Sequence, residues 1–189
     1  MPAEARVTKI WKQQKLFIAL FLIAFGLWFF IDGKWVWPRS NERFDLHKQF
    51  EQENRLSEWP AEAKKRGWKA EPPHKRHEPN DILAQFVFAS LCGFGGAVAL
   101  FYWLTQKSRV VKSDAEAVYS PAGTRVPFDA ITGLGVKKWD SKGLATVRYE
   151  ISGRQGQFVL DDYKFERDPT HAIFNEIKEK LEGRAKPPA

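Results

Sequence analysis

Four titratable side chains in one short stretch are the first candidates for chemistry in this sequence. His74 and His77 lie close to Glu71 and Glu78, and both residue types can ligate a metal ion. The H-x-x-H spacing is informative mainly on a helix, whereas the surrounding sequence EPPHKRHEP is rich in proline. Two histidines also leave a coordination shell incomplete. We therefore expect an extended, solvated linker here and no metal site.

Acid–base and nucleophilic catalysis have similarly weak support. Asp161 and Asp162 are adjacent, and neighbouring residues of a strand point to opposite faces, so their carboxylates should not converge on one substrate. His171 falls in the first turn of a predicted helix, with no readable nucleophile to serve. The sequence also lacks a nucleophile elbow, a phosphate-binding glycine loop, a dinucleotide fingerprint and a metalloprotease helix. We expect a protein that is not an enzyme and that binds no cofactor.

A basic turn is the strongest candidate for binding. It contains Lys137, Lys138, Trp139 and Lys142, a combination of charge and aromatic surface that suits phosphate headgroups or an acidic partner. A solvated turn is the alternative interpretation. These four residues are the predicted lipid or partner contact.

Two uncharged segments dominate the remaining sequence. Leu16–Ile31 has sixteen residues, short for a span of roughly 30 Å, and Ile82–Leu104 has 23. A cleaved signal peptide is the alternative for the first, but no A-x-A-like site follows it. We predict two transmembrane helices. Their ends carry residues typical of a membrane interface, namely Lys15, Trp28, Trp35, Trp37, Tyr102 and Trp103.

Small residues in the second segment predict close helix packing. Ala89, Gly93 and Ala97 recur every four residues with Gly96 beside them, which allows another helix to approach closely. The first helix of the chain is the first candidate partner, and a second copy or another protein is the alternative. Neither segment contains a charged residue or histidine, so we do not expect transport by this chain alone.

Charge and cysteine content narrow the class of protein. The formal net charge is +7, and basic residues cluster beside the apolar segments, which favours anionic lipid over nucleic acid as a partner. The single cysteine, Cys92, excludes an intrachain disulfide. A count of Lys and Arg favours the connecting segment on the cytoplasmic side. We nevertheless predict cytoplasmic termini in a bacterial-type inner membrane, because the leading flank of the first helix is basic and its trailing edge begins with Asp32.

The charged connecting segment is expected to contain two short helices. Ser40 is the predicted N-cap of a helix through about Leu56. Trp59-Pro60 begins a second helix that Gly67 ends.

After the second span, the pattern predicts a small α+β domain. Alternating residues predict strands at Glu116–Tyr119, Arg125–Phe128, Ile131–Trp139 and Ala145–Ser152, with a further strand around Phe158 and Leu160 after a turn at Gly153–Gly156. Asp168 and Pro169 begin an amphipathic helix that ends at Gly183. The predicted organisation is a basic flank 1–15, spans 16–31 and 82–104, a connecting segment 32–81, the domain 105–183 and a tail 184–189.

The predicted order of elements is a pair of spans followed by an antiparallel sheet and one closing helix. This order resembles that of the bacterial pleckstrin-homology-like membrane proteins. The resemblance covers about Val110 to Glu182 and rests on the run Arg125–Ile131 and on the closing helix. It implies a seven-stranded fold, of which five strands are readable here. It carries over no catalytic residue.

The resulting expectation is a non-enzymatic, membrane-anchored accessory or scaffold protein, most simply a subunit of a larger membrane complex. Its partners would be lipids together with another membrane protein or a second copy of the chain. The alternative is a membrane-apposed module that binds anionic lipid headgroups through the basic turn.

Overall fold

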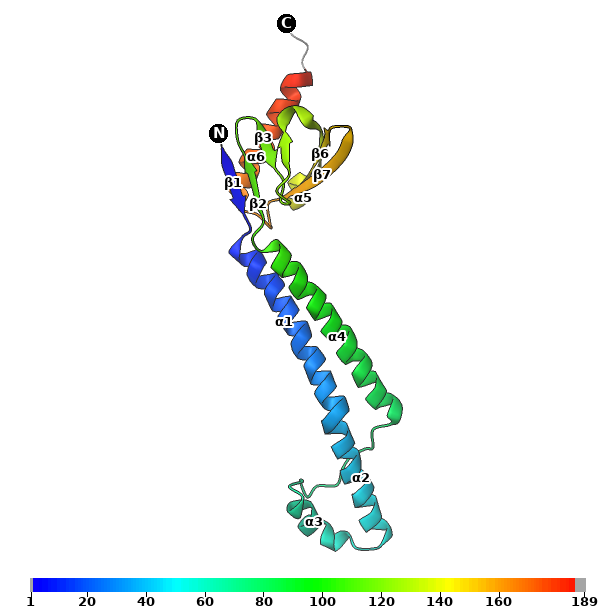
Figure 1. Cartoon of the computed structure of the whole chain (residues 1–189). Helices are drawn as coiled ribbons and strands as arrows, with labels where there is room; N and C mark the ends of the chain where they lie inside the picture. Colours follow the sequence, from blue (N-terminus) through cyan, green and yellow to red (C-terminus); the bar gives the residue numbers. More distant parts are fainter. Residues whose placement is uncertain (1, 186–189) are drawn as a thin grey trace. The chain divides into compact units, whose positions relative to one another are not determined.

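The computed structural model describes residues 2–185, and these belong to two compact units (Figure 1). One unit combines Met1–Phe17 with Leu100–Ala189, and the other is Ile18–Ala99. The first is an α+β domain with the adjoining ends of the two long helices. The second is helical. The prediction that the chain contains two long apolar helices and an α+β domain with antiparallel sheets is confirmed.

Seven strands form two antiparallel sheets in the α+β domain. The four-stranded sheet has the order β1 (Ala3–Arg6), β2 (Val110–Ser113), β3 (Ala117–Tyr119) and β4 (Arg125–Pro127). The three-stranded sheet has the order β5 (Ile131–Lys138), β6 (Leu144–Ile151) and β7 (Arg154–Asp161). Within each sheet the strands are therefore in sequence order, although both long helices lie between β1 and β2 in the sequence.

Strand β1 corrects the expectation that residues 1–15 form only a basic flank. It lies beside β2 (Figure 1), and the register of the pair sets Ala3 opposite Ser113 and Arg6 opposite Val110. The Ala5 side chain is fully buried in the domain core, because alternate residues of a strand point to the same face. The N-terminus is thus an edge strand of the domain.

Of the other six strands, β3 to β6 begin and end within one residue of their predicted bounds, whereas β2 was not predicted and β7 begins earlier than expected. Ser152 and Gly153 both have positive φ and connect β6 to β7 as a two-residue turn, so β7 begins at Arg154, inside the predicted turn. The turn between β5 and β6 contains one short helix, α5 (Trp139–Lys142), which ends at Gly143 with φ 65°.

Helix α6 (Arg167–Ala185) closes the domain as predicted. Ile173, Phe174 and Ile177 are buried against the core that both sheets contribute. The helix continues two residues past the predicted end at Gly183. Arg184 donates hydrogen bonds to the carbonyls of Asp129 and Ile131, both at 3.0 Å, and these contacts hold the last turn in place.

The first long helix is continuous from Lys9 to Gln52. It consists of α1 (Lys9–Ile31), a π-helical turn (Asp32–Val36) and α2 (Trp37–Gln52). The prediction that Ser40 caps a separate helix is therefore wrong. Pro38 in a regular helix would clash with the carbonyl of Lys34, and the wider π turn contains that residue.

The second long helix, α4 (Pro79–Gln106), extends past both ends of the predicted span 82–104. Helices α1 and α4 are each long and apolar enough to cross a membrane, by length and composition. They pack closely within the helical unit. A Cβ atom added to Gly26 would lie 2.9 Å from the backbone nitrogen of Gly93.

The connecting segment folds around one buried tryptophan. Helix α3 (Trp59–Lys65) follows a 3-10 turn, and Trp59 donates from Nε1 to the carbonyl of Ala70 at 2.8 Å. Gly67 has φ 70° and ends this helix as predicted. Trp59 is therefore part of a small core within the connecting segment.

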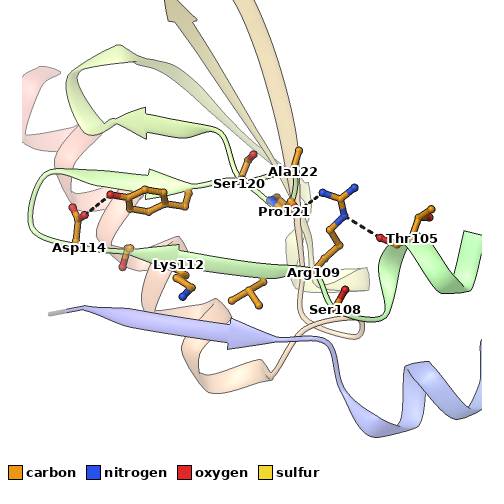
Figure 2. Close-up of a pocket in the computed structure, with 12 residues that line it drawn as sticks. Thr105, Ser108, Arg109, Lys112, Asp114, Ser120, Pro121 and Ala122 are labelled. Carbon is orange, nitrogen blue, oxygen red and sulfur yellow. Dashed lines mark hydrogen bonds between the residues drawn. The ribbon is translucent and has the colours of Figure 1, made fainter.

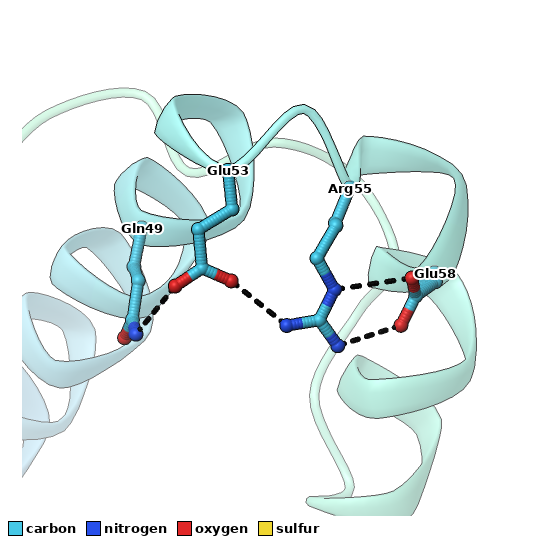
Figure 3. A network of polar contacts seen from close by, with 4 residues as sticks. All are labelled: Gln49, Glu53, Arg55 and Glu58. Atoms are coloured by element: carbon cyan, nitrogen blue, oxygen red, sulfur yellow. Dashed lines mark hydrogen bonds and ion pairs between the residues drawn. The ribbon is translucent and has the colours of Figure 1, made fainter.

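An exposed ion network forms the corner between α2 and α3 (Figure 3). Arg55 bonds Glu53 at 2.8 Å and Glu58 through two contacts of 3.1 and 2.7 Å. These hydrogen bonds, together with one from Gln49 to Glu53, lower the pKa of both glutamates. Because the groups are exposed, the network orients the corner and adds little stability.

Candidate functional site

The ends of both long helices are built into the α+β domain without a free linker. After β1, the amide of Thr8 donates to the carbonyl of Lys164 at 2.8 Å. Near the end of α4, Trp103 donates from Nε1 to the carbonyl of Lys12 on α1 at 2.9 Å. Trp11 is buried in the same core as the strands. We call this region, residues 7–15 with 102–109 and 163–166, the junction.

Lys164 is the central charge of the junction. Its ammonium lies 5.1 Å from the ring centroid of Trp11 and 5.2 Å from that of Phe165, and it donates to Gln106 Oε1 at 2.7 Å. Burial of the side chain lowers the pKa of Lys164. The sequence offers no sign of this role, since Lys164 reads there as one more charge at a strand end.

The predicted basic turn lies at the junction end of the domain. Its short helix α5 is linked to the start of the β7–α6 connection, because the amide of Asp162 donates to the carbonyl of Gly143 at 3.0 Å. The next residue, Tyr163, donates from its hydroxyl to Gln14 on α1. The basic turn and the helix ends therefore occupy one end of the domain.

The four residues predicted to bind a lipid or partner have different surroundings in the structure. Trp139 stacks on Phe174 with ring centroids 4.0 Å apart and an interplanar angle of 9°, so it packs α5 against α6. Lys137, Lys138 and Lys142 are exposed. The lysines are accessible to an anionic partner, whereas the indole is engaged within the domain.

An open hollow of about 620 Å³ beside the turn contains a histidine–carboxylate pair. His171 Nε2 lies 3.0 Å from Asp162 Oδ2, and Arg167 Nε lies 3.6 Å from the same oxygen. Ser141 lines this hollow, but within residues 2–185 its hydroxyl makes no hydrogen bond to His171. The pair thus links α6 to the β7–α6 connection, and Ser141 is not activated as a nucleophile by His171.

The two adjacent carboxylates have separate partners, as expected for neighbouring residues at a strand end. Asp161 Oδ1 accepts from the amides of Tyr163 and Lys164, both at 3.0 Å, whereas Asp162 faces His171. Metal binding is also without support in the part of the chain that the structure describes, because no three His, Cys, Asp or Glu side chains gather there. His77 instead stacks on Trp37 at 4.2 Å.

A second open hollow of the domain, with a volume of about 770 Å³, lies between the α4–β2 connection and the β3–β4 turn (Figure 2). Arg109 crosses it and donates to the carbonyls of Thr105 at 3.0 Å and Pro121 at 3.1 Å. Lys112, which also lines it, pairs with Glu4 at 2.9 Å. Sequence reasoning identified Arg109 only as a basic flank of the second span.

Asp114 supplies the negative charge of the same hollow. It accepts hydrogen bonds from the amides of Glu116 and Ala117, both at 2.8 Å, and from the Tyr119 hydroxyl at 2.9 Å (Figure 2). These bonds lower the pKa of Asp114, the amides contributing most. The charged groups of this hollow are therefore largely engaged in holding the sheet and its turns together.

Three residues of the predicted small-residue stripe, Ala89, Gly93 and Gly96, lie in the contact between α1 and α4. Added Cβ atoms show the closeness: one on Gly96 would lie 2.7 Å from Ile23 Cγ1, and one on Gly26 would lie 3.1 Å from the carbonyl oxygen of Ala89. Ala97 differs from the prediction because it is exposed. The first helix of the same chain therefore covers the stripe.

The predicted interface aromatics lie in different surroundings. Trp28 and Trp35 are exposed, and the Trp28 indole donates to Asp32 at 2.8 Å. Trp37 is covered on one face by His77. The remaining predicted interface residues, Lys15, Tyr102 and Trp103, belong to the junction.

Comparison with known proteins identifies no similar protein. No protein-family model, no curated protein and no solved structure matches this chain. The resemblance to pleckstrin-homology-like membrane proteins consequently stays a prediction.

Proposed function

We propose that α1 and α4 cross a lipid bilayer as a hairpin. The observation that carries this proposal is the apolar surface that the two helices leave uncovered. Leu27, Leu91 and Phe94 are 59%, 64% and 75% exposed, and further large apolar side chains are exposed along both helices. Soluble proteins rarely leave so much contiguous apolar surface in water, whereas hydrocarbon would cover it.

The α+β domain would be a pleckstrin-homology-like domain at the cytoplasmic face of a bacterial-type inner membrane. Seven strands and a closing helix agree with the number of elements that this resemblance implies. The pairing of β1 with β2 supports an even number of crossings, because these strands flank the hairpin in the sequence. The basic flank that precedes the apolar part of α1, together with Asp32 at its far end, favours the cytoplasm for this side.

The function that this arrangement supports best is that of a non-enzymatic scaffold or accessory subunit in a membrane protein complex. The junction is the supporting feature, since the domain is built directly on the helix ends and would present its surfaces beside the bilayer. A partner would find two kinds of surface there, the outer faces of the helices and the exposed faces of the domain.

Gentle detergent extraction of the tagged native protein, followed by size analysis and mass spectrometry, tests this function. We expect a membrane protein to co-purify at a fixed stoichiometry. The matched control is the same extraction with a Lys137→Glu, Lys138→Glu, Lys142→Glu variant, which separates protein contacts from contacts through the basic turn. Recovery of only monomers or homodimers would contradict the accessory-subunit proposal.

Binding of anionic lipid headgroups is the second candidate function. It is favoured by the position of the three exposed lysines at the junction end of the domain, where a bilayer surface would lie. The triple glutamate variant should lose the preference of the protein for vesicles containing phosphatidylglycerol over neutral vesicles. Unchanged preference would remove this function from the basic turn.

A further inference from the structure

A hollow in the connecting segment is richer in arginine than any hollow described above. It has a volume of about 670 Å³ and lies between the beginning of α2 and the end of α3. The lining residues that matter are Trp35, Arg39, Glu42, Arg43, Arg66 and Trp68. Three guanidinium groups therefore share the hollow with one carboxylate.

The three arginines differ in how far the protein satisfies them. Arg66 pairs with Glu62 at 2.7 Å and with Glu42 at 3.3 Å, so the one lining carboxylate is already engaged. Arg43 donates through Nη2 to the carbonyls of Lys69 and Glu71, and its Nε is buried without a hydrogen-bond partner among the described residues.

Arg39 is the least engaged of the three. Its side chain is exposed, and no hydrogen bond or ion pair joins it to any of residues 2–185. The hollow therefore combines one fixed guanidinium, held by backbone carbonyls, with one that is free to close on a ligand.

The chemistry of this set favours a phosphate group. Guanidinium groups donate in a planar fork that matches two phosphate oxygens, and they keep their charge at all physiological pH values. The Ser40 hydroxyl, which also lines the hollow, adds a neutral donor. A cation would be repelled by the excess positive charge.

The position of the hollow along the first helix favours a lipid as the source of that phosphate. A hydrocarbon layer of roughly 30 Å needs about 20 helical residues, so a span that begins at Leu16 ends near Trp35. Arg39 follows one helical turn later, about 6 Å further along the axis. The exposed indole of Trp35 suits the same interfacial layer.

We infer that the hollow between α2 and α3 binds the phosphate of an anionic lipid headgroup. The lipid source rests on the proposed membrane hairpin, whereas the phosphate chemistry rests on the three arginines alone. This site would be separate from the basic turn of the domain, and it belongs to the leaflet that faces the connecting segment.

Native mass spectrometry of the full chain in a mild non-ionic detergent tests the inference. Phosphatidylglycerol and phosphatidylcholine are titrated in parallel, and the bound lipid is counted at each concentration. We expect phosphatidylglycerol to bind more tightly than phosphatidylcholine, and Arg39→Gln to weaken its binding about tenfold, the size of one charge-assisted contact. Because Arg39 is exposed and has no internal partner among the described residues, this variant should fold.

Lys64→Gln is the matched control, since it removes the same charge from exposed α3 and does not line the hollow. Equal loss of affinity in both variants, or equal binding of the two lipids, would overturn the inference. Glycerol phosphate is a third titrant. If it binds as tightly as the lipid, the phosphate site stands and the lipid source is overturned.

Carbonate washing of membranes tests the hairpin separately. If carbonate releases the protein, the membrane hairpin is refuted and the lipid source with it, whereas glycerol phosphate binding in detergent still tests the hollow. If the protein stays in the membrane, the lipid titrations decide the inference.

Discussion

The contact between α1 and α4 allows a sharp test, because two glycines three residues apart on α4 have opposite surroundings. A Cβ atom on Gly96 would lie 2.7 Å from Ile23 Cγ1 and 2.9 Å from the backbone nitrogen of Ile23. A Cβ atom on Gly93 would meet nothing within 4 Å. The Gly96→Ala and Gly93→Ala variants therefore make the same chemical change, but only the former pushes against the backbone of the facing helix.

The magnitudes can be worked out from these contacts. Replacing glycine by alanine within a helix favours the helix by about 1 kcal/mol in both variants. Overpacking of a well-packed contact costs about 1 to 3 kcal/mol, and only Gly96→Ala incurs it. We expect Gly93→Ala to be neutral or slightly stabilising, and Gly96→Ala to be less stable than Gly93→Ala by about 1 to 3 kcal/mol.

Unfolding by sodium dodecyl sulfate in mixed micelles, followed by tryptophan fluorescence, measures this difference. Gly26→Ala provides an independent check from the other helix, since its Cβ would lie 2.9 Å from the backbone nitrogen of Gly93. It should behave like Gly96→Ala. If Gly93→Ala destabilises the protein as much as Gly96→Ala, the space around Gly93 is not open and the reasoning is refuted.

Three further predictions concern the α+β domain. The folded-state pKa of Asp114 lies below its ordinary value of 3.8. The stabilisation from this carboxylate is therefore present above pH 3.8 and is lost as the pH falls through the lower, folded-state pKa. Asp114→Asn should consequently flatten the dependence of the melting temperature on acid pH. Gly143→Ala should destabilise the domain by about 1 kcal/mol more than Gly153→Ala in chemical unfolding, because both have positive φ but only Gly143 lies against the Asp162 carboxylate; equal losses would contradict this. Ala5→Asp should place a carboxylate in the core and remove the protection of the β1 amides from hydrogen exchange, whereas retained protection would show that β1 is not part of the sheet.

The elements that the sequence predicts well are those with strong local patterns. The uncharged runs identify α1 and α4 because apolar stretches of this length favour long helices. Alternation over eight residues identifies β6, and the spacing of Ile173, Phe174 and Ile177 identifies α6. Each of these signals lies within one element.

Features that depend on distant partners were missed. Strand β1 has four residues, and its partner β2 lies about 100 residues away, so no local pattern reveals the pairing. The continuity of α1 with α2 was missed because the apolar run ends at Asp32 and Ser40 is a residue type that often caps a helix, whereas the π turn between them has no sequence signature. Trp139 was read as accessible because its stacking on Phe174 joins two separate elements.

The arginine hollow between α2 and α3 was also missed, because a local sequence pattern does not show which distant residues meet. Arg39 and Arg43 are one helical turn apart and can be recognised as neighbours, but Arg66 joins them only because the chain folds back through α3. In the sequence these three residues count only as positive charges in a long connecting segment, and there they favour the opposite membrane orientation.

The place of β1 ahead of both helices sets an order of events during synthesis. The strand leaves the ribosome before both helices, and its partner β2 follows only after about 100 further residues, which take roughly 5 to 20 s to translate. Closing so long a loop costs about 3 kcal/mol more than closing a four-residue hairpin, unless α1 and α4 have already packed and brought its ends together. Strand β1 is thus made before both helices but pairs only after them. The β1–β2 pair therefore forms only once the helical hairpin has formed.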